Sequence, residues 1–130
     1  MNGTHAIDAY RHVGAQGGVT DASPHQLIAM LLNGALDRIA SAKGAMDRGD
    51  TASQGALLGK AISIIDSMRA SLDAERGGDI AANLGDLYTY METRLLQGGA
   101  NTDPEALDEV SRLLREIKTG WDSIPAEHRG

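Results

Sequence analysis

Hydrophobic side chains recur along most of this chain at spacings of three and four residues, which is the period of an α-helix. We call each such run a seam. The first seam contains Ile28, Leu32, Ala35, Ile39, Ala42 and Met46. The second contains Leu58, Ala61, Ile65, Met68 and Leu72, and the last contains Leu107, Val110, Leu114, Ile117, Trp121 and Ile124. Alternating steps of four and three predict helices that pack against neighbours at a shallow angle.

Start signals precede three of the predicted helices. Ser23, Pro24 and Gln26 predict a capping box with proline in the first turn, and that helix ends at 48–50. A second capping box is predicted from Thr51 to Gln54. The last helix starts at the cap and proline of 102–105 and closes at Pro125.

A helical hairpin is predicted around two consecutive glycines, Gly77 and Gly78, which separate the second and third helices. The third helix runs from about Asp79 to Gln97 and stops at 98–99. Large apolar side chains are expected on the facing sides of the two arms, at Leu72, Ile80, Leu84, Leu87 and Met91.

Short connections between four long helices favour antiparallel neighbours. We therefore predict an all-α fold, an antiparallel up-down-up-down four-helix bundle over residues 23–125. Residues 1–22 are expected to form a flexible N-terminal arm and 126–130 a disordered tail. Ile7, Tyr10 and Val13 share one face of the arm, so a fifth helix is the alternative if the arm orders.

Composition narrows the class of protein. The chain has 130 residues, no cysteine and a net charge of −6, which argues against disulfides, thiolate metal sites and a nucleic-acid footprint. The N-terminus has neither a basic head nor an apolar core, so no signal peptide is expected. No run approaches the roughly 20 apolar residues of a membrane span.

Catalytic and metal-binding patterns are not found. Glu-x-x-His pairs, which build di-iron sites in bundles, do not occur, and His5, His12, His25 and His128 are neither paired nor on a seam. The glycine-containing run 55–60 lies within a helix and lacks the order of a phosphate-binding loop. We expect no metal, no cofactor and no enzymatic activity.

Several apolar residues lie off the seams. They are Leu27, Met30, Leu57, Ile64, Tyr90 and Leu113. Together they predict apolar grooves between helices that an amphipathic partner segment could fill, although a wide core would also place them there. Six glycines within helices, 34, 44, 55, 59, 85 and 120, agree with close approach by a guest backbone or with tight helix crossing.

Two stretches of the chain resemble a known family. Residues 71–95, SLDAERGGDIAANLGDLYTYMETRL, and residues 20–31, TDASPHQLIAML, are similar to the middle and the opening motif of the flagellin export chaperones, the FliS family. Matching positions extend from about residue 9 to 124. The sequence departs from the family at Asp21, within the opening motif, and at Leu32-Asn33, where the family commonly has Tyr-Asp.

The resemblance implies a cytoplasmic chaperone. Its client would be the C-terminal segment of flagellin, kept unpolymerised and competent for flagellar type III secretion, with one monomer for each client. By position, the resemblance assigns Ile7 and Tyr10 to the arm. It assigns to the groove Leu57, Ile64, Asn83, Leu84, Tyr88 and Tyr90.

Two other classes stay open. One is a regulatory or adaptor bundle that binds a different protein, and the resemblance implies that this would be another flagellar protein, such as an anti-sigma factor or a component of the export gate. The other is a small helical enzyme or cofactor carrier, which the missing ligand patterns disfavour.

Overall fold

A computed structural model describes residues 23–72 and 74–125, and these residues form four helices and no strand. The helices are α2 (Pro24–Asp47), α3 (Thr51–Ala70), α4 (Ala74–Asn101) and α5 (Pro104–Asp122). The predicted all-α, four-helix fold is confirmed. The expected arm at 1–22, with Ile7 and Tyr10, and the expected tail at 126–130 lie outside the described residues.

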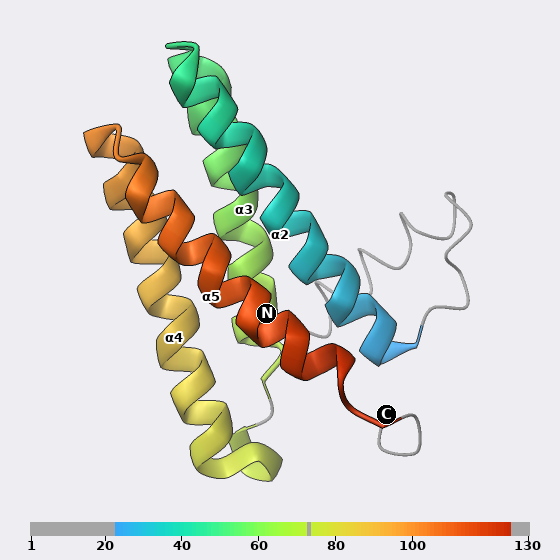
Figure 1. Cartoon of the computed structure of the whole chain (residues 1–130). Helices are drawn as coiled ribbons and strands as arrows, with labels where there is room; N and C mark the ends of the chain where they lie inside the picture. Colours follow the sequence, from blue (N-terminus) through green and yellow to red (C-terminus); the bar gives the residue numbers. More distant parts are fainter. Residues whose placement is uncertain (1–22, 73, 126–130) are drawn as a thin grey trace.

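The four helices form a closed ring. α2 packs against α3 and α5, and α4 packs against the same two helices. Figure 1 shows that each helix runs opposite to the one before it along the chain. Each helix therefore has two neighbours and keeps one outward face.

The core follows the predicted seams. Its fully buried large side chains are Leu27, Leu32, Ile39, Ile65, Met68, Met91, Leu95, Leu107, Val110 and Leu114. Leu27 is among them, so its predicted position beside a groove is wrong. Ile117 and Trp121 are only partly buried, because the lower end of the last seam is less completely covered.

The start of α2 is formed as the sequence predicts. The Ser23 hydroxyl accepts from Gln26 N–H at 3.1 Å, and the Gln26 side chain accepts from Ser23 N–H at 2.7 Å. This capping box satisfies two backbone donors that have no partner within the helix.

The second capping box was assigned to the wrong residue. Asp50, not Thr51, is the N-cap of α3, and its carboxylate accepts from Ser53 N–H at 3.1 Å. Hydrogen bonding with Ser53 lowers the pKa of Asp50. The Gln54 side chain instead donates to the carbonyl of Gly99 at 3.0 Å and so joins α3 to α4.

The break between α3 and α4 lies near its predicted place. Gly78 has φ 52° and ψ −128°, a non-helical conformation that glycine adopts readily, and one short turn from Ala74 precedes it. α3 ends at Ala70, earlier than predicted. Ile80, expected to face α3, is 78% exposed, and the buried face at this point passes through Ala81 instead.

Gly98 and Gly99 do not stop α4, which continues to Asn101. A Cβ atom on Gly98 would lie 2.9 Å from Ala106 Cβ, and one on Gly99 would lie 2.9 Å from Leu58 Cδ1. The two glycines therefore allow close packing of α4 against α5 and α3. The turn follows at Thr102, whose φ is 50°.

α5 starts at the predicted proline and is joined to α2 at its far end. Asp103 caps it by accepting from Glu105 N–H at 3.1 Å, and the helix ends at Asp122, before Pro125. The Trp121 indole N–H donates to the His25 carbonyl at 2.9 Å, and His25 Nε2 lies 2.8 Å from the Trp121 carbonyl. The two rings stack with centroids 4.7 Å apart, so these residues fix the lower end of the bundle.

Candidate partner-binding grooves

The outward side of α3 exposes a group of small residues, Gly55, Ala56, Gly59 and Ser63, which we call its small-residue face. A Cβ atom added to Gly55 or Gly59 would meet nothing within 4 Å. Each glycine costs roughly 0.5 to 1 kcal/mol relative to alanine inside a helix. No neighbour in the described part of the chain requires these two glycines, so no described contact compensates for their cost.

The first groove lies between α2 and α3. It is an open hollow of about 590 Å³ lined by Arg38, Ala56, Gly59, Lys60, Ser63 and Ile64. Ile64 also contacts the core and lies near Gly34 on α2. Arg38 and Lys60 form no ion pair with any residue that the structure describes, so the groove carries two positive charges at an apolar surface.

The second groove lies on the other side of α3, against α4. It has a volume of about 200 Å³ and is lined by Gly55, Leu58, Gly59, Ile62, Leu95, Leu96 and Gly99. Leu96 is 63% exposed, whereas Leu95 beside it is fully buried. Sequence reasoning missed Leu96. The adjacent pair of leucines was a usable signal, because consecutive helical residues point about 100° apart and only one could face the core.

Leu84 and Tyr88, both assigned to the groove, lie at a third place. They line a cavity of about 140 Å³ at the α3–α4 connection, together with Ile28, Met68, Ser71, Leu72, Ile117 and Trp121. Tyr88 is only 3% exposed and belongs to the hydrophobic core, and burial raises its pKa to about 12. It therefore presents little surface to a docking segment.

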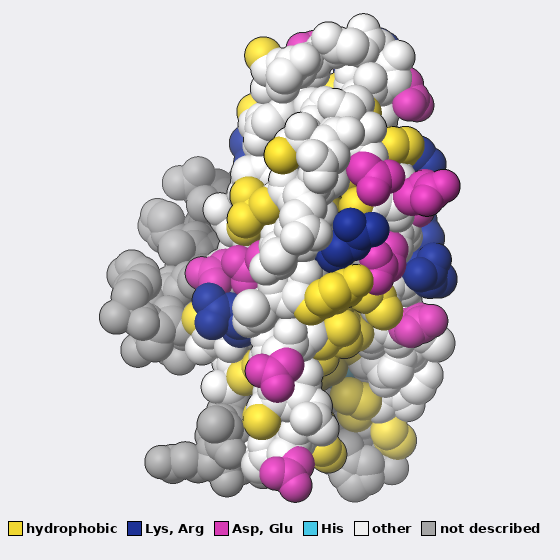
Figure 2. All heavy atoms as spheres, turned by 90° about the vertical axis from the view of Figure 1, so that its left-hand side faces the viewer, with side chains coloured by type: hydrophobic (Ala, Val, Ile, Leu, Met, Phe, Trp, Pro, Cys, Tyr) yellow, Lys and Arg dark blue, Asp and Glu magenta, His cyan; other side chains and the backbone are white. Residues whose placement is uncertain are grey.

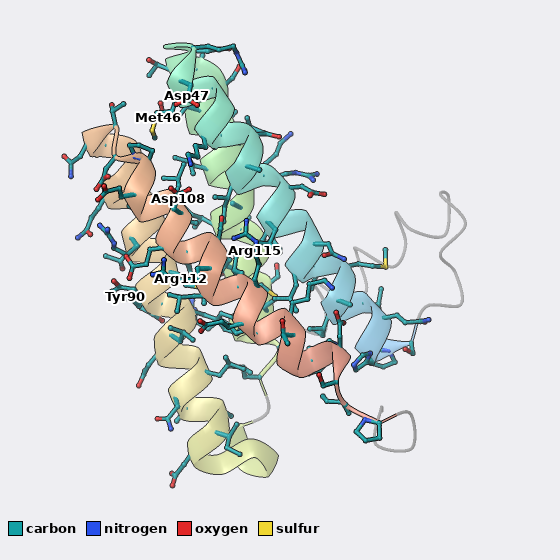
Figure 3. All side chains as sticks on the ribbon, in the orientation of Figure 1. Met46, Asp47, Tyr90, Asp108, Arg112 and Arg115 are labelled. Atoms are coloured by element: carbon teal, nitrogen blue, oxygen red, sulfur yellow. The ribbon has the colours of Figure 1, made fainter. Side chains whose placement is uncertain are left out.

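Tyr90 lies on a different surface, between α4 and α5 (Figure 3). It is 44% exposed, and its hydroxyl donates to Glu109 Oε2 at 2.6 Å, while Arg94 Nε donates to Oε1 at 2.8 Å. These two hydrogen bonds lower the pKa of Glu109, and the nearby charge of Arg112 adds to the effect. Figure 2 shows hydrophobic side chains gathered along this flank of α4, next to basic and acidic side chains.

The predicted site residues therefore do not form one continuous surface. Ile64 lines the α2–α3 groove, Leu84 and Tyr88 line the cavity, and Tyr90 lies on the α4–α5 flank. Leu57 is partly buried against the core, and Asn83 is exposed. Of the predicted site residues that the structure describes, Ile64 lines the groove beside the small-residue face of α3.

Within residues 23–72 and 74–125, no three His, Cys, Asp or Glu side chains are grouped so that they could hold a metal ion. None of the helices in these ranges is both long enough and apolar enough to cross a membrane.

The fold and the grooves define a class of protein: an α-helical bundle with apolar surface grooves and no grouped metal ligands among its described side chains. Comparison with known proteins makes this specific. The family model described as flagellar protein FliS matches residues 6–128. The chain belongs to the FliS family.

Relatives in three bacteria cover nearly the whole chain. The flagellar secretion chaperone FliSB of Pseudomonas aeruginosa is 49% identical over 119 residues, which is 92% of this chain and 94% of that protein. The flagellar secretion chaperone FliS of Vibrio cholerae is 42% identical over 95% of this chain and 90% of its own. The protein of the same name in Salmonella typhimurium is 45% identical over 91% and 88%.

Proposed function

We propose that this protein is a cytoplasmic export chaperone that binds the C-terminal segment of flagellin. It keeps that segment from polymerising prematurely and holds it competent for flagellar type III secretion. The protein acts as a monomer with one client, and it catalyses no reaction. The single observation that supports this most is the pair of apolar grooves that flank the small-residue face of α3.

The two grooves suit an amphipathic helical segment. Each has apolar walls, at Ile64 on one side and at Ile62 and Leu96 on the other, and both share Gly59. A guest helix could lay its apolar side chains into either groove while its backbone approaches the bare surface at Gly55 and Gly59. Arg38 and Lys60, which form no ion pair with a described residue, would attract acidic residues on the guest.

Covering the client's apolar face explains the chaperone action without an energy source. An amphipathic segment with an exposed apolar face associates with copies of itself, and burying that face in a groove removes the surface that drives the association. Ile7 and Tyr10 are proposed to act beside this path, on the N-terminal arm.

A second partner would have a separate surface. The α4–α5 flank carries Tyr90, held by Glu109, beside the ion pair of Glu109 with Arg94. Aromatic and arginine side chains of this kind are frequent in protein interfaces. This flank lies away from the outer face of α3, so an export-gate component or an anti-sigma factor could bind there without displacing flagellin.

The experiment is calorimetric titration with a synthetic flagellin C-terminal peptide, comparing Leu96→Asp with Ile80→Asp. Both residues are exposed, so neither change should unfold the bundle, but only Leu96 lines a groove beside α3. Losing one buried leucine contact of about 1.5 to 3 kcal/mol should weaken binding by about 10- to 150-fold.

Ile80→Asp is the control and should bind the peptide within about twofold of the unmodified protein, as expected for an exposed residue away from the grooves. A peptide that does not bind the unmodified protein would rule out the proposed client. Equal losses in the two variants would place the flagellin site elsewhere on the bundle.

A further inference from the structure

The groove between α2 and α3 differs in charge from the groove between α3 and α4. Arg38 and Lys60 line the α2–α3 groove, and its lining residues include no aspartate or glutamate. The α3–α4 groove is lined by glycine, leucine and isoleucine alone. The two grooves flank the same small-residue face of α3, so they offer different chemical surfaces to a guest helix.

The two cations lie at one level of the α2–α3 groove. A Cβ atom on Gly34 would lie 3.5 Å from Ile64 Cδ1, so these two residues face each other where α2 meets α3. The two helices run in opposite directions (Figure 1). Arg38 is one turn further along α2 and Lys60 is one turn back along α3. Both cations are therefore displaced in the same direction, about 6 Å along the groove from Ile64.

No carboxylate of the described chain compensates these two charges. Neither Arg38 nor Lys60 forms an ion pair with a described residue, whereas four other basic residues do. Two like charges on opposite walls of one groove repel each other unless an anion lies between them. The chain as a whole has a net charge of −6 and would repel an acidic segment elsewhere on its surface. The groove is thus a local place where a guest carboxylate is favoured.

We propose that the α2–α3 groove selects an acidic amphipathic helix of the client. One carboxylate of the guest lies between Arg38 and Lys60, and an apolar side chain one turn away packs against Ile64. Lys60 and Ile64 are four residues apart on α3, and side chains three or four apart on a guest helix share one face in the same way. The α3–α4 groove takes an uncharged apolar stretch. As a property of the client-binding groove, this selectivity rests on the proposed function.

The test uses the full chain and two synthetic amphipathic peptides of about 18 residues, or five helical turns, that share one leucine face. One peptide carries glutamate beside the leucines, and the other carries glutamine, which has nearly the same helix propensity. In calorimetry at about 0.1 M salt, the glutamate peptide should bind about 2- to 10-fold more tightly, as expected for one or two exposed ion pairs. At about 1 M salt, where the Debye length is about 3 Å, the preference should disappear.

Charge reversal in the groove should remove the preference. Lys60→Glu and Arg38→Glu are each expected to make the glutamate peptide bind no more tightly than the glutamine peptide. Arg115→Glu on α5 is the matched control, because Arg115 is exposed, lines neither groove and forms no ion pair with a described residue. It changes the net charge by the same amount and should keep the preference. All three side chains are exposed, so the variants should fold.

Two isoleucine methyl groups report which groove is occupied. Ile64 lines the α2–α3 groove and Ile62 lines the α3–α4 groove. In methyl-labelled protein, the glutamate peptide should shift the NMR signal of Ile64 more than that of Ile62. The proposal is overturned if the glutamate peptide has no advantage over the glutamine peptide, if Arg115→Glu removes that advantage as Lys60→Glu does, or if the Ile62 signal alone moves.

A separate titration with the flagellin C-terminal peptide distinguishes this selectivity from the proposed function. Lys60→Glu should weaken binding of that peptide by about 2- to 10-fold, and Arg115→Glu should not. A flagellin peptide that fails to bind the unmodified protein would contradict the proposed function, while the designed peptides still measure the charge preference of the groove. Equal binding of the flagellin peptide to the unmodified protein and to Lys60→Glu would overturn the assignment of the acidic helix to the client.

Discussion

Two pairs of helical glycines in this bundle have opposite surroundings. Gly98 and Gly99 lie where α4 touches α5 and α3, and a Cβ atom at either position would meet another side chain at 2.9 Å. Gly55 and Gly59 lie on the outer face of α3, where a Cβ atom would meet nothing within 4 Å. The first pair is required by packing between helices, whereas no described residue packs against the second pair.

This difference separates internal from external uses of glycine. A helix tolerates glycine at a cost, and at 98–99 that cost is offset by closer contact between helices. At 55 and 59 the described residues offer no compensating contact. A smooth face with no compensating contact among the described residues is the strongest indication, in this fold, of a surface where another backbone approaches.

The largest effect on stability is expected at two adjacent leucines of α4, Leu95 and Leu96. Leu95→Ala removes a fully buried side chain and should lower the free energy of unfolding by about 2 to 5 kcal/mol. Leu96→Ala, one residue along and 63% exposed, should change it by no more than about 0.5 kcal/mol. Urea unfolding of both variants measures this, and equal losses would show that the α4 register is wrong.

A smaller effect is expected from alanine at the packed glycine. Gly98→Ala places a methyl group against Ala106 Cβ, which cannot move without its backbone, and overpacking of this kind costs about 1 to 3 kcal/mol. The gain in helix propensity of about 0.5 to 1 kcal/mol offsets only part of it. Thermal unfolding should show a lower Tm, and a raised Tm would mean that α4 and α5 are not in close contact there.

The smallest effect has the opposite sign. Gly55→Ala and Gly59→Ala should each stabilise the fold by about 0.5 to 1 kcal/mol, because the added methyl groups meet nothing. If the proposed client lies against this face, the same variants should bind the flagellin peptide more weakly although they unfold at higher temperature. Stabilisation with unchanged binding would separate the glycines from the client site.

Periodicity predicted the four helices well, because burial of a repeating apolar face is the main force that positions them. It was less reliable where a local signal had two physical meanings. Gly98-Gly99 resembled a helix stop but serves helix contact, and Thr51 to Gln54 resembled a capping box although Asp50 provides the cap. The first error comes from contacts with residues distant in sequence. The second has a local cause, because Asp50 accepts from Ser53 N–H, and a distant one, because the Gln54 side chain donates to Gly99.

The candidate site was predicted less completely than the fold. Ile64 was identified because it lies off the seam, and the structure places it in a groove. Tyr88 was assigned by position in the family motif, and the pattern could not show that its side chain is buried in the core. Nothing in the sequence singles out Arg38 and Lys60. What distinguishes them is that no described carboxylate lies close enough to form an ion pair with either, and only the three-dimensional structure shows this.

The bonds between His25 and Trp121 have a consequence for folding kinetics. They join residues 96 positions apart, the two ends of the described chain, whereas the α2–α3 and α4–α5 hairpins are formed by neighbouring segments. Closing a long loop costs more chain entropy than closing a short one, so the hairpins are expected to form before this contact. Trp121 is the single tryptophan of the chain, so its fluorescence should follow the last step of folding rather than the first.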